Sequence, residues 1–391
     1  MGVYEQLGLQ PIINASGTVT RLGGAPMPQA VLDAFCQAAR ESVPIEHLQA
    51  AASKIIANAT GTERALVTAG AAAALTLGSA AILTGYDLGR IERLPRCDDY
   101  PHELIVAREH RNSYDHAVRA TGARLVEVGF NELPTGAGVR RVEAWEYEAA
   151  FGPRTAGVLY VMSPGAQPPL AEVVRRAHAH HLPVLVDAAG ELPPRANLKE
   201  FAALGADLVA FSGGKAIRGP QATGILCGRA DLVSAAALQM LDMDDYLELW
   251  EPPPGLFDRD KLDGMPRMGV GRGLKVSKEQ IVALLTALEM FVRGDYDAEL
   301  VGFRKRLQSI AAVLEKSACR SMLIEGKADC LPLLEISVDE ARLGRTPARR
   351  CHHIGLPTGR AGRCCCASEM SGSGRRSFRA SRAANSAFAS G

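Results

Sequence analysis

The chain has 391 residues, of which 47% are hydrophobic and 22% are charged, and its formal net charge is +1. These values exclude a largely disordered chain, and the near-zero balance gives no general reason to expect nucleic-acid binding. The length allows one large core and a smaller second domain.

Charge and cysteine are unevenly distributed along the chain. Residues 341–391 hold ten Arg, no Lys and one acid, so this segment contributes +9 and the first 340 residues carry −8. Four of the nine cysteines lie in the same segment, and the other five show no CxxC spacing. Since residues 1–10 also lack an apolar secretory segment, we expect free thiols in a reducing cytoplasm.

In chain order, residues 1–50 are expected to form an N-terminal arm and an active-site loop. The uncharged stretch Ala65–Gly85 follows. It is long enough to span a membrane, but it consists mostly of Ala, Gly, Thr and Ser, which are weak drivers of insertion, and Gly70 indicates a break. We therefore expect a buried strand, a turn and a helix here, and no membrane association.

Short β-type runs alternate with helical stretches between residues 64 and 228. Several of these runs are almost wholly apolar, as strands covered on both faces are. The expected strands are 64–69, 103–107, 124–128, 157–162, 184–187, 207–211 and 223–227, with helices between them such as 169–181 and 198–204. This alternation predicts an α/β fold of three layers, with a mainly parallel seven-stranded sheet, in a large domain at residues 51–260.

The last third of the chain predicts a partial small α+β domain at residues 261–340. Its expected elements are helices at 277–293 and 298–317 and strands at 321–325 and 331–338. Beyond about residue 345 the sequence sustains no period of 2 or 3.6. For the Arg-, Cys- and Ser-rich tail at 341–391 we weigh a disordered basic segment, an RNA-contacting arm and a frameshifted end. We favour the frameshift, which leaves the small domain disrupted.

The strongest chemical signal is Lys215, which follows an apolar strand and lies among glycines in the segment SGGKAIRGPQ at 212–221. Ligands bind at the carboxyl edge of a parallel sheet, and a partly desolvated lysine there has a lowered pKa and acts as an amine nucleophile. Ser212 is placed to bond a phosphate beside it. The alternative is a surface turn with a solvated lysine. The spacing is not that of a Walker loop.

Two further strand ends carry candidate residues. Asp187 closes a buried strand 28 residues before Lys215, where a carboxylate could keep a pyridine nitrogen protonated and make the ring an electron sink, or could cap the next turn. Gly70, Ala71 and Ala72 follow an earlier strand. They could present backbone N–H groups to a phosphate at a helix start, or could simply allow close helix packing.

Histidines supply the last candidates. His110 follows another strand and could stack on a planar cofactor or transfer a proton; a solvated or structural loop histidine is the alternative. His178, His180 and His181 have no strand-borne acid nearby, so we interpret them as a solvated helix end and predict no metal site. An amine, an acid, an anion-binding turn and an imidazole at four strand ends together favour pyridoxal phosphate as the cofactor.

These motifs resemble the selenocysteine-synthase-like branch of fold-type I pyridoxal-phosphate enzymes, the L-seryl-tRNA(Sec) selenium transferases. Within that branch the sequence is most similar to the D-glucosaminate-6-phosphate ammonia-lyase group. The resemblance covers roughly residues 4–340 and is carried by INASGT at 13–18, VDAAGELPP at 186–194, SGGKAIRGPQATG at 212–224 and GRGLKVSKEQIVALLTALE at 271–289. It implies the aminotransferase-like fold of type I.

The resemblance also implies a role for each candidate residue. Lys215 would be the Schiff-base lysine, Asp187 the partner of the pyridine nitrogen, and His110 the ring-stacking residue with a part in catalysis. The residues implied around the phosphate are Gly70, Ala71, Ala72 and Ser212. The candidate substrate contacts are Asn14, Ser16, Arg21 and Arg272. A homodimer or higher homo-oligomer, with active sites at the subunit interface, is implied as well.

Two activities of the branch share α-proton abstraction and expulsion of a β-hydroxyl. The lyase then releases ammonia and a 2-keto-3-deoxy sugar acid, whereas the synthase adds selenium to an aminoacrylyl-tRNA. The motif at 13–18, which opens the catalytic domain in this branch, comes almost at once, whereas the synthase normally carries an extra N-terminal tRNA-binding domain. We therefore expect a lyase acting on a small amino sugar acid, without tRNA as a partner. The alternatives are a selenium transferase, another class-V aminotransferase-like enzyme, and an inactive pseudo-enzyme with a disrupted C-terminus.

Overall fold

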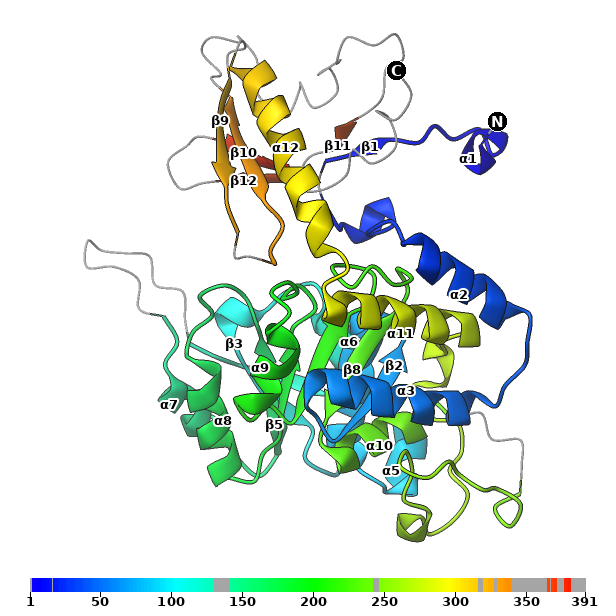
Figure 1. The fold of residues 1–391 in the computed structure, drawn as a ribbon. Helices are drawn as coiled ribbons and strands as arrows, with labels where there is room; N and C mark the ends of the chain where they lie inside the picture. Colours follow the sequence, from blue (N-terminus) through cyan, green and yellow to red (C-terminus); the bar gives the residue numbers. More distant parts are fainter. Residues whose placement is uncertain are drawn as a thin grey trace. The chain divides into compact units, whose positions relative to one another are not determined.

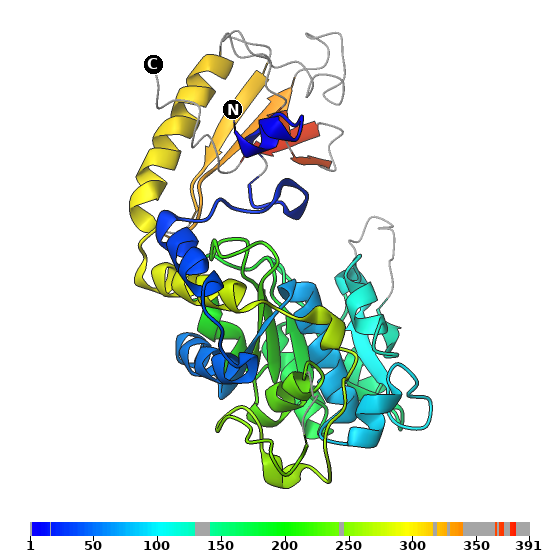
Figure 2. The ribbon, with the colours of Figure 1, turned by 90° about the vertical axis from the view of Figure 1, so that its right-hand side faces the viewer.

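The structure is a computed structural model that describes most of the chain. The described residues are 2–15, 17–129, 141–241, 246–315, 319–326 and 329–338, together with the backbone of short strands at 364–365, 367–370 and 376–380. The chain forms two compact units, one of residues 26–292 and one that combines 1–25 with 293–391. Figures 1 and 2 show the elements of each.

The centre of the larger unit is a seven-stranded sheet. Its strands are β2 (Arg64–Thr68), β3 (Glu103–Ala107), β4 (Arg124–Val128), β5 (Thr155–Val161), β6 (Val184–Asp187), β7 (Leu208–Ser212) and β8 (Gly224–Gly228). Their order is β2-β8-β7-β6-β5-β3-β4; β8 is antiparallel to both neighbours and the other pairs are parallel. The predicted fold class and all seven predicted strands are confirmed, each boundary within two residues.

Helices cover both faces of this sheet, which gives the three predicted layers (Figure 2). The longer ones are α2 (Gln29–Ala39), α3 (Ile45–Thr60), α4 (Gly70–Thr84), α8 (Leu170–Ala179), α10 (Ala230–Leu238) and α11 (Lys278–Arg293). The shorter ones are α5 (Leu88–Arg93), α6 (Asp115–Arg119), α7 (Ala144–Ala149) and α9 (Asn197–Ala203). From β3 the chain continues to β4, at the edge of the sheet. It then returns to β5 on the other side of β3, and β6 and β7 follow in order away from β3. The topological switch point, where such sheets bind ligands, therefore lies between β3 and β5.

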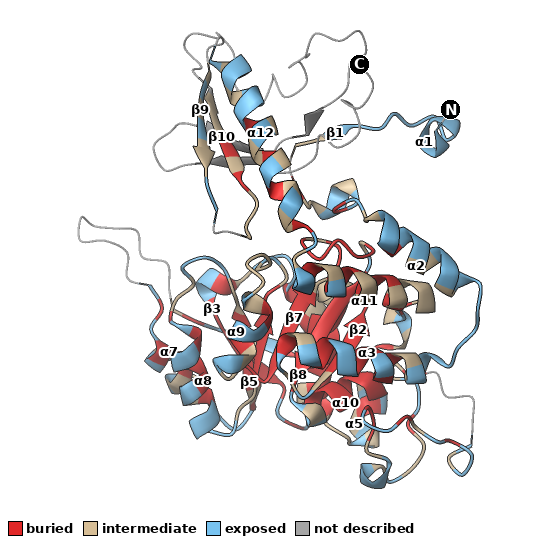
Figure 3. Cartoon of the chain, viewed as in Figure 1, coloured by how far each residue is buried: buried red, intermediate tan, exposed pale blue. Residues whose placement is uncertain are grey.

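The uncharged stretch at 65–85 forms β2 and α4, as predicted. Most residues of α4 are buried, and so are those of β7 and β8, the strands on which it packs (Figure 3). A Cβ atom at Gly78 would lie only 3.0 Å from Leu185 of β6, so the small residues let this helix pack closely on the sheet. In the part of the chain that the structure describes, no helix is both long and apolar enough to cross a membrane.

The smaller unit contains the predicted helix and strand pair. They are α12 (Asp297–Leu314), β9 (Cys319–Ile324) and β10 (Leu333–Val338). Two strands of the tail, β12 (Ala367–Met370) and β13 (Arg376–Ala380), extend the pair into an antiparallel sheet of order β12-β13-β10-β9. Near the other terminus, α1 (Val3–Gln6) precedes β1 (Ile13–Asn14), which pairs with β11 (Cys364–Cys365). The rest of the tail lies outside the described residues, so its frameshifted origin stays a prediction.

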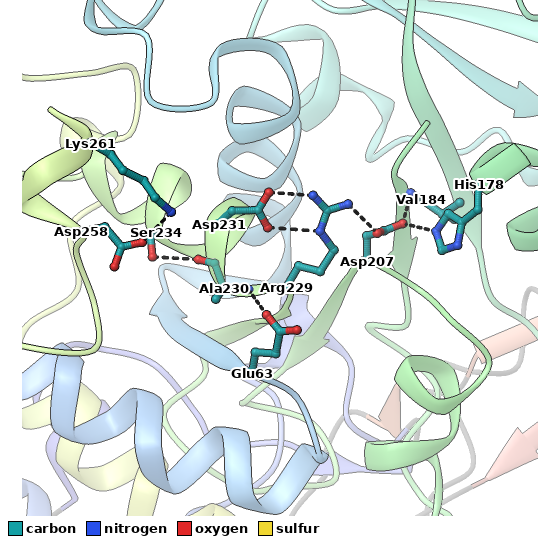
Figure 4. Close-up of polar contacts among 10 residues, drawn as sticks. All are labelled: Glu63, His178, Val184, Asp207, Arg229, Ala230, Asp231, Ser234, Asp258 and Lys261. Atoms are coloured by element: carbon teal, nitrogen blue, oxygen red, sulfur yellow. Dashed lines mark hydrogen bonds and ion pairs between the residues drawn. The ribbon is translucent and has the colours of Figure 1, made fainter. Parts of the chain in front are cut away.

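One sequence-based interpretation was wrong. His178 of α8 is not simply solvated, because its Nε2 atom bonds Oδ2 of Asp207 at 2.8 Å (Figure 4). Asp207 is 3% exposed and directly precedes β7; it also accepts hydrogen bonds from the Val184 backbone N–H at 2.8 Å and from Arg229 at 2.9 Å. The sequence did not reveal this contact because it depends on β6 and β7 being neighbours. Asp207 holds the amino-terminal edge of the sheet, opposite the strand ends considered next.

Candidate active site

Lys215 lies in a closed loop between β7 and β8. The Gly213 N–H donates to the Thr223 carbonyl at 2.9 Å, and the Gly219 N–H donates to the Gly213 carbonyl at 2.9 Å. Lys215 itself is half-buried. This burial lowers the pKa of its amine, against the carboxylates of Asp187 and Glu191, which raise it. Lys215 is therefore not a fully solvated lysine on a surface turn.

The glycines of this loop are required by close packing. A Cβ atom at Gly213 would lie 2.3 Å from Oγ1 of Thr223 and 2.6 Å from Cδ1 of Leu284 in α11. One at Gly214 would lie 2.5 Å from Cα of Gln221. The loop is thus held between its own return strand and α11. Two of the segments that carry the family resemblance, at 212–224 and 271–289, are in contact here.

Asp187 ends β6, the strand next to β7, and is 7% exposed. The Ala189 N–H donates to its Oδ1 atom at 3.1 Å. Burial raises the pKa of the Asp187 carboxyl, while this hydrogen bond and the charge of Lys215 lower it. The predicted acid and amine therefore lie at one edge of the sheet and influence each other electrostatically.

Glu191 is the residue that sequence reasoning missed. It lies in the turn after β6, where its N–H donates to the Ala188 carbonyl at 3.1 Å and its own carbonyl accepts a hydrogen bond from Asn197 at 2.7 Å. Its half-buried side chain interacts electrostatically with Asp187 and Lys215, and burial raises the pKa of its carboxyl. Its place within the VDAAGELPP segment was the only signal that could have indicated it.

The predicted phosphate-binding residues also lie at this edge. Gly224, at the start of β8, pairs with Ser212 of β7 on one side and with Thr68 of β2 on the other. Gly70 begins α4 with a φ of +84°, which favours glycine. A Cβ atom at Gly224 would lie 2.3 Å from the carbonyl carbon of Gly70. Strand β8 therefore packs directly against the turn whose N–H groups at Gly70, Ala71 and Ala72 open the helix.

His110 is buried rather than solvated, with 5% exposure at the end of a short turn after β3. Its ring meets that of Tyr160 edge to face, with centroids 4.6 Å apart. The Tyr147 hydroxyl lies 3.5 Å from its Nδ1 atom and accepts a hydrogen bond from the Ala107 N–H at 3.1 Å. Burial lowers the pKa of His110, so the imidazole is uncharged at neutral pH. Its stacking on a cofactor stays a prediction.

The predicted substrate contacts are more scattered. Asn14 and Arg21 belong to the smaller unit, and Ser16 lies outside the described residues. Arg272 lies in a short turn of the larger unit, after Gly271, where a Cβ atom would be 2.4 Å from Leu77 of α4. The glycines at 269 and 271 thus allow close packing. The substrate roles of all four residues stay predictions.

The residues present fit pyridoxal phosphate. A half-buried amine follows β7 and a buried carboxylate ends β6, so an aldehyde and a pyridine nitrogen can each find a partner at adjacent strand ends. No side chain caps the first turn of α4 within the described residues, which leaves its N–H groups available to a phosphate. The donor set therefore matches the aldehyde, ring and phosphate of this cofactor.

Comparison with known proteins agrees with this geometry. The class-V aminotransferase family model matches residues 106–242, which include Asp187 and Lys215. A 5'-C-glycyluridine monooxygenase-decarboxylase from a Streptomyces species is 33% identical, over 91% of this chain and 82% of its own length. The D-glucosaminate-6-phosphate ammonia lyase of Salmonella typhimurium is 30% identical, over 80% of this chain and 76% of its own. The chain belongs to the class-V aminotransferase family.

The family assignment extends to the fold and to the general chemistry. A solved structure of D-glucosaminate-6-phosphate ammonia-lyase superposes with a TM-score of 0.74 and 26% identity, covering 97% of this chain and 92% of that one. An L-seryl-tRNA(Sec) selenium transferase from Rhizobium meliloti is 32% identical over 58% of this chain and half of its own length. Members of the family are enzymes that use pyridoxal phosphate. The resemblance stated from the sequence is confirmed.

Proposed function

We propose that this class-V family member is a pyridoxal-phosphate-dependent lyase that converts a small amino sugar acid, of the D-glucosaminate 6-phosphate type, into a 2-keto-3-deoxy acid and ammonia. The observation that carries the proposal is the pairing of a half-buried amine, Lys215, with a buried carboxylate, Asp187, at neighbouring strand ends. The relatives that match most of the chain supply the substrate class.

In this proposal each strand end holds one part of the cofactor. Lys215 binds the aldehyde carbon, Asp187 faces the pyridine nitrogen, and His110 covers the ring. The N–H groups of Gly70, Ala71 and Ala72 bind the phosphate, helped by the Ser212 hydroxyl. When bound, the cofactor supplies an electron sink for the pair of electrons left on the substrate α-carbon.

Lys215 is the base in this account. With cofactor and substrate bound, its Nζ atom would take the α-proton of the substrate. Burial lowers the pKa of Lys215, so a larger fraction of the amine is unprotonated at neutral pH than in water. The ionised Asp187 carboxylate would keep the pyridine nitrogen protonated, which lets the ring act as an electron sink. The β-hydroxyl then leaves as water, and the released enamine takes up water to give the keto acid and ammonia.

The substrate class is supported by what the relatives' names have in common. D-Glucosaminate 6-phosphate, 5'-C-glycyluridine and a seryl group each carry an amine on a carbon adjacent to one that bears a hydroxyl. A shared β-hydroxy-α-amino acid unit suits a site that removes an α-proton and expels a β-hydroxyl. We propose a small molecule rather than tRNA, because the lyase matches 80% of this chain and the selenium transferase matches 58%.

Oxidative decarboxylation is the second candidate function. The 33% identity to the monooxygenase-decarboxylase over 91% of this chain favours it. Such a reaction breaks the bond from the α-carbon to the carboxylate and consumes molecular oxygen, whereas the lyase reaction needs neither. The two candidates therefore differ in products that are easily measured.

The test is an assay of cofactor-loaded protein with D-glucosaminate 6-phosphate, and separately with 5'-C-glycyluridine, under air and under argon. The lyase proposal predicts equal amounts of ammonia and keto acid from the amino sugar acid, unchanged under argon. Carbon dioxide release and oxygen uptake with the glycyl nucleoside, without keto acid from the sugar, would replace the proposal by the second candidate. We also propose a homodimer, which sedimentation of the loaded protein would test.

A further inference from the structure

Glu191 is a carboxyl group of the site that the steps described so far do not use. It follows Asp187 by four residues and leaves β6 at the same edge of the sheet as Lys215. The Glu191 backbone donates a hydrogen bond to the Ala188 carbonyl and accepts one from the Asn197 side chain, and these two bonds fix the turn. Its position is therefore set by the sheet rather than by a mobile surface segment.

The side chain of Glu191 is half-buried and has no hydrogen-bond or ion-pair partner among the residues the structure describes. Asp187 accepts the N–H of Ala189, so the two acids of this edge differ: Asp187 is held by the backbone, while the Glu191 carboxyl is left to interact with Lys215 and Asp187 through charge.

The reaction requires a proton donor. Expulsion of a β-hydroxyl as water needs a proton at the moment the bond from Cβ to oxygen breaks, because hydroxide is a poor leaving group. Resting on the proposed lyase function, we propose that Glu191 is the acid that delivers this proton to the departing hydroxyl. Burial and the neighbouring charge of Asp187 raise the pKa of the Glu191 carboxyl towards the protonated form that this role needs, although the charge of Lys215 opposes them.

The step balances in atoms and electrons. The pair of electrons left on Cα forms a second bond to Cβ, and the pair of the breaking bond leaves with the oxygen. That oxygen takes the Glu191 proton and departs as water. The Glu191 carboxylate then regains a proton from the Lys215 ammonium, which holds the proton taken from Cα. The cycle removes one hydrogen and one hydroxyl from the substrate and returns both residues to their starting states.

The experiment separates proton abstraction from elimination. Substrate is incubated in D₂O with cofactor-loaded wild type, Glu191→Gln, Glu191→Asp and the control Glu200→Gln, which changes an exposed acid on α9. Exchange of the α-hydrogen is followed by NMR and keto acid by its absorbance. We expect Glu191→Gln to retain exchange within a few-fold while elimination falls on the order of 10²-fold or more. The elimination rate of Glu191→Asp should lie between those of wild type and Glu191→Gln. Glu200→Gln should exchange and eliminate at the wild-type rates.

A second readout needs no turnover. In the apoprotein, the pH dependence of Lys215 labelling by an amine reagent reports its pKa. When it is ionised, the Glu191 carboxylate raises the pKa of Lys215, so Glu191→Gln should lower that pKa at alkaline pH relative to wild type and to Glu200→Gln. Since this measurement requires a folded site but no substrate, it detects a Gln variant that has merely lost its structure.

The outcomes are distinguishable. If wild type neither exchanges the α-hydrogen nor releases ammonia, the proposed lyase function fails, and the role of Glu191 fails with it. If wild type is active and the folded Glu191→Gln variant eliminates as fast as it exchanges, or loses both steps equally, only the role of Glu191 is overturned.

Discussion

Asp187 and Lys215 follow neighbouring strands, β6 and β7, at one edge of the sheet, and each affects the protonation of the other. Burial favours the uncharged form of both groups, while their mutual attraction favours the charged forms. Such opposed influences on paired titratable groups are typical of active sites. One cofactor could therefore be held at both positions, with its aldehyde at Lys215 and its protonated ring nitrogen at Asp187.

The burial of Lys215 predicts a pH-dependent stability. The pKa of the amine is lower in the folded apoprotein than its ordinary value of 10.5, so below that value the unfolded chain binds more protons and stability rises with pH. Lys215→Met should therefore be more stable than wild type at pH 7, with a difference that shrinks as the pH approaches 10. Urea unfolding at both ends of this range measures it. The control Lys305→Met changes an exposed lysine; a similar gain there would contradict the explanation.

Asp187→Asn keeps the size of the side chain but removes its charge. The amide cannot hold a proton on the pyridine nitrogen, so we expect α-hydrogen exchange to fall on the order of 10²-fold. Loss of the negative charge should also lower the pKa of Lys215 further. Exchange rates and amine labelling test the two effects. A variant with wild-type exchange would show that Asp187 serves only to cap the turn at Ala189.

Gly224→Ala tests the proposed phosphate site. The added Cβ would lie 2.3 Å from Gly70 and 2.6 Å from the Ala71 nitrogen, so the turn that opens α4 must move. Overpacking of this kind costs about 1–3 kcal/mol, and we expect cofactor affinity to fall about 10-fold or more. A matched control is Gly152→Ala, where the Cβ meets no atom within 4 Å. Equilibrium dialysis measures the cofactor affinity of both variants. Equal affinities of Gly224→Ala and Gly152→Ala would mean that the phosphate binds elsewhere.

Asp207→Ala should destabilise the larger unit without involving the active site. It leaves the Val184 N–H without its acceptor and Arg229 without its buried partner (Figure 4). An unsatisfied buried N–H costs about 1–3 kcal/mol, and loss of the ion pair with the half-exposed Arg229 adds about 1 kcal/mol or less. Asp231→Ala removes only the half-exposed partner of Arg229, which should cost about 1 kcal/mol or less. Urea unfolding gives the loss in free energy of unfolding for both variants. Equal losses would show that Asp207 contributes no more to stability than Asp231.

The sequence predicted the sheet well because its strands are short apolar runs whose limits are marked by polar residues and glycine. It also predicted Lys215 and Asp187, since carboxyl ends of parallel strands meet at one edge. The antiparallel direction of β8 depends on how the loop after Lys215 returns between β7 and β2, which no local pattern encodes. Likewise, the contact of His178 with Asp207 and the approach of Glu191 to Lys215 depend on strand order and loop geometry.

Borohydride reduction of the cofactor-loaded protein, followed by peptide mass spectrometry, tests the central claim most directly, because it fixes the cofactor to the amine that holds it. The account predicts a phosphopyridoxyl group on Lys215 alone, and none in Lys215→Ala. A label on another lysine, or an unlabelled Lys215 in folded and loaded protein, would contradict it.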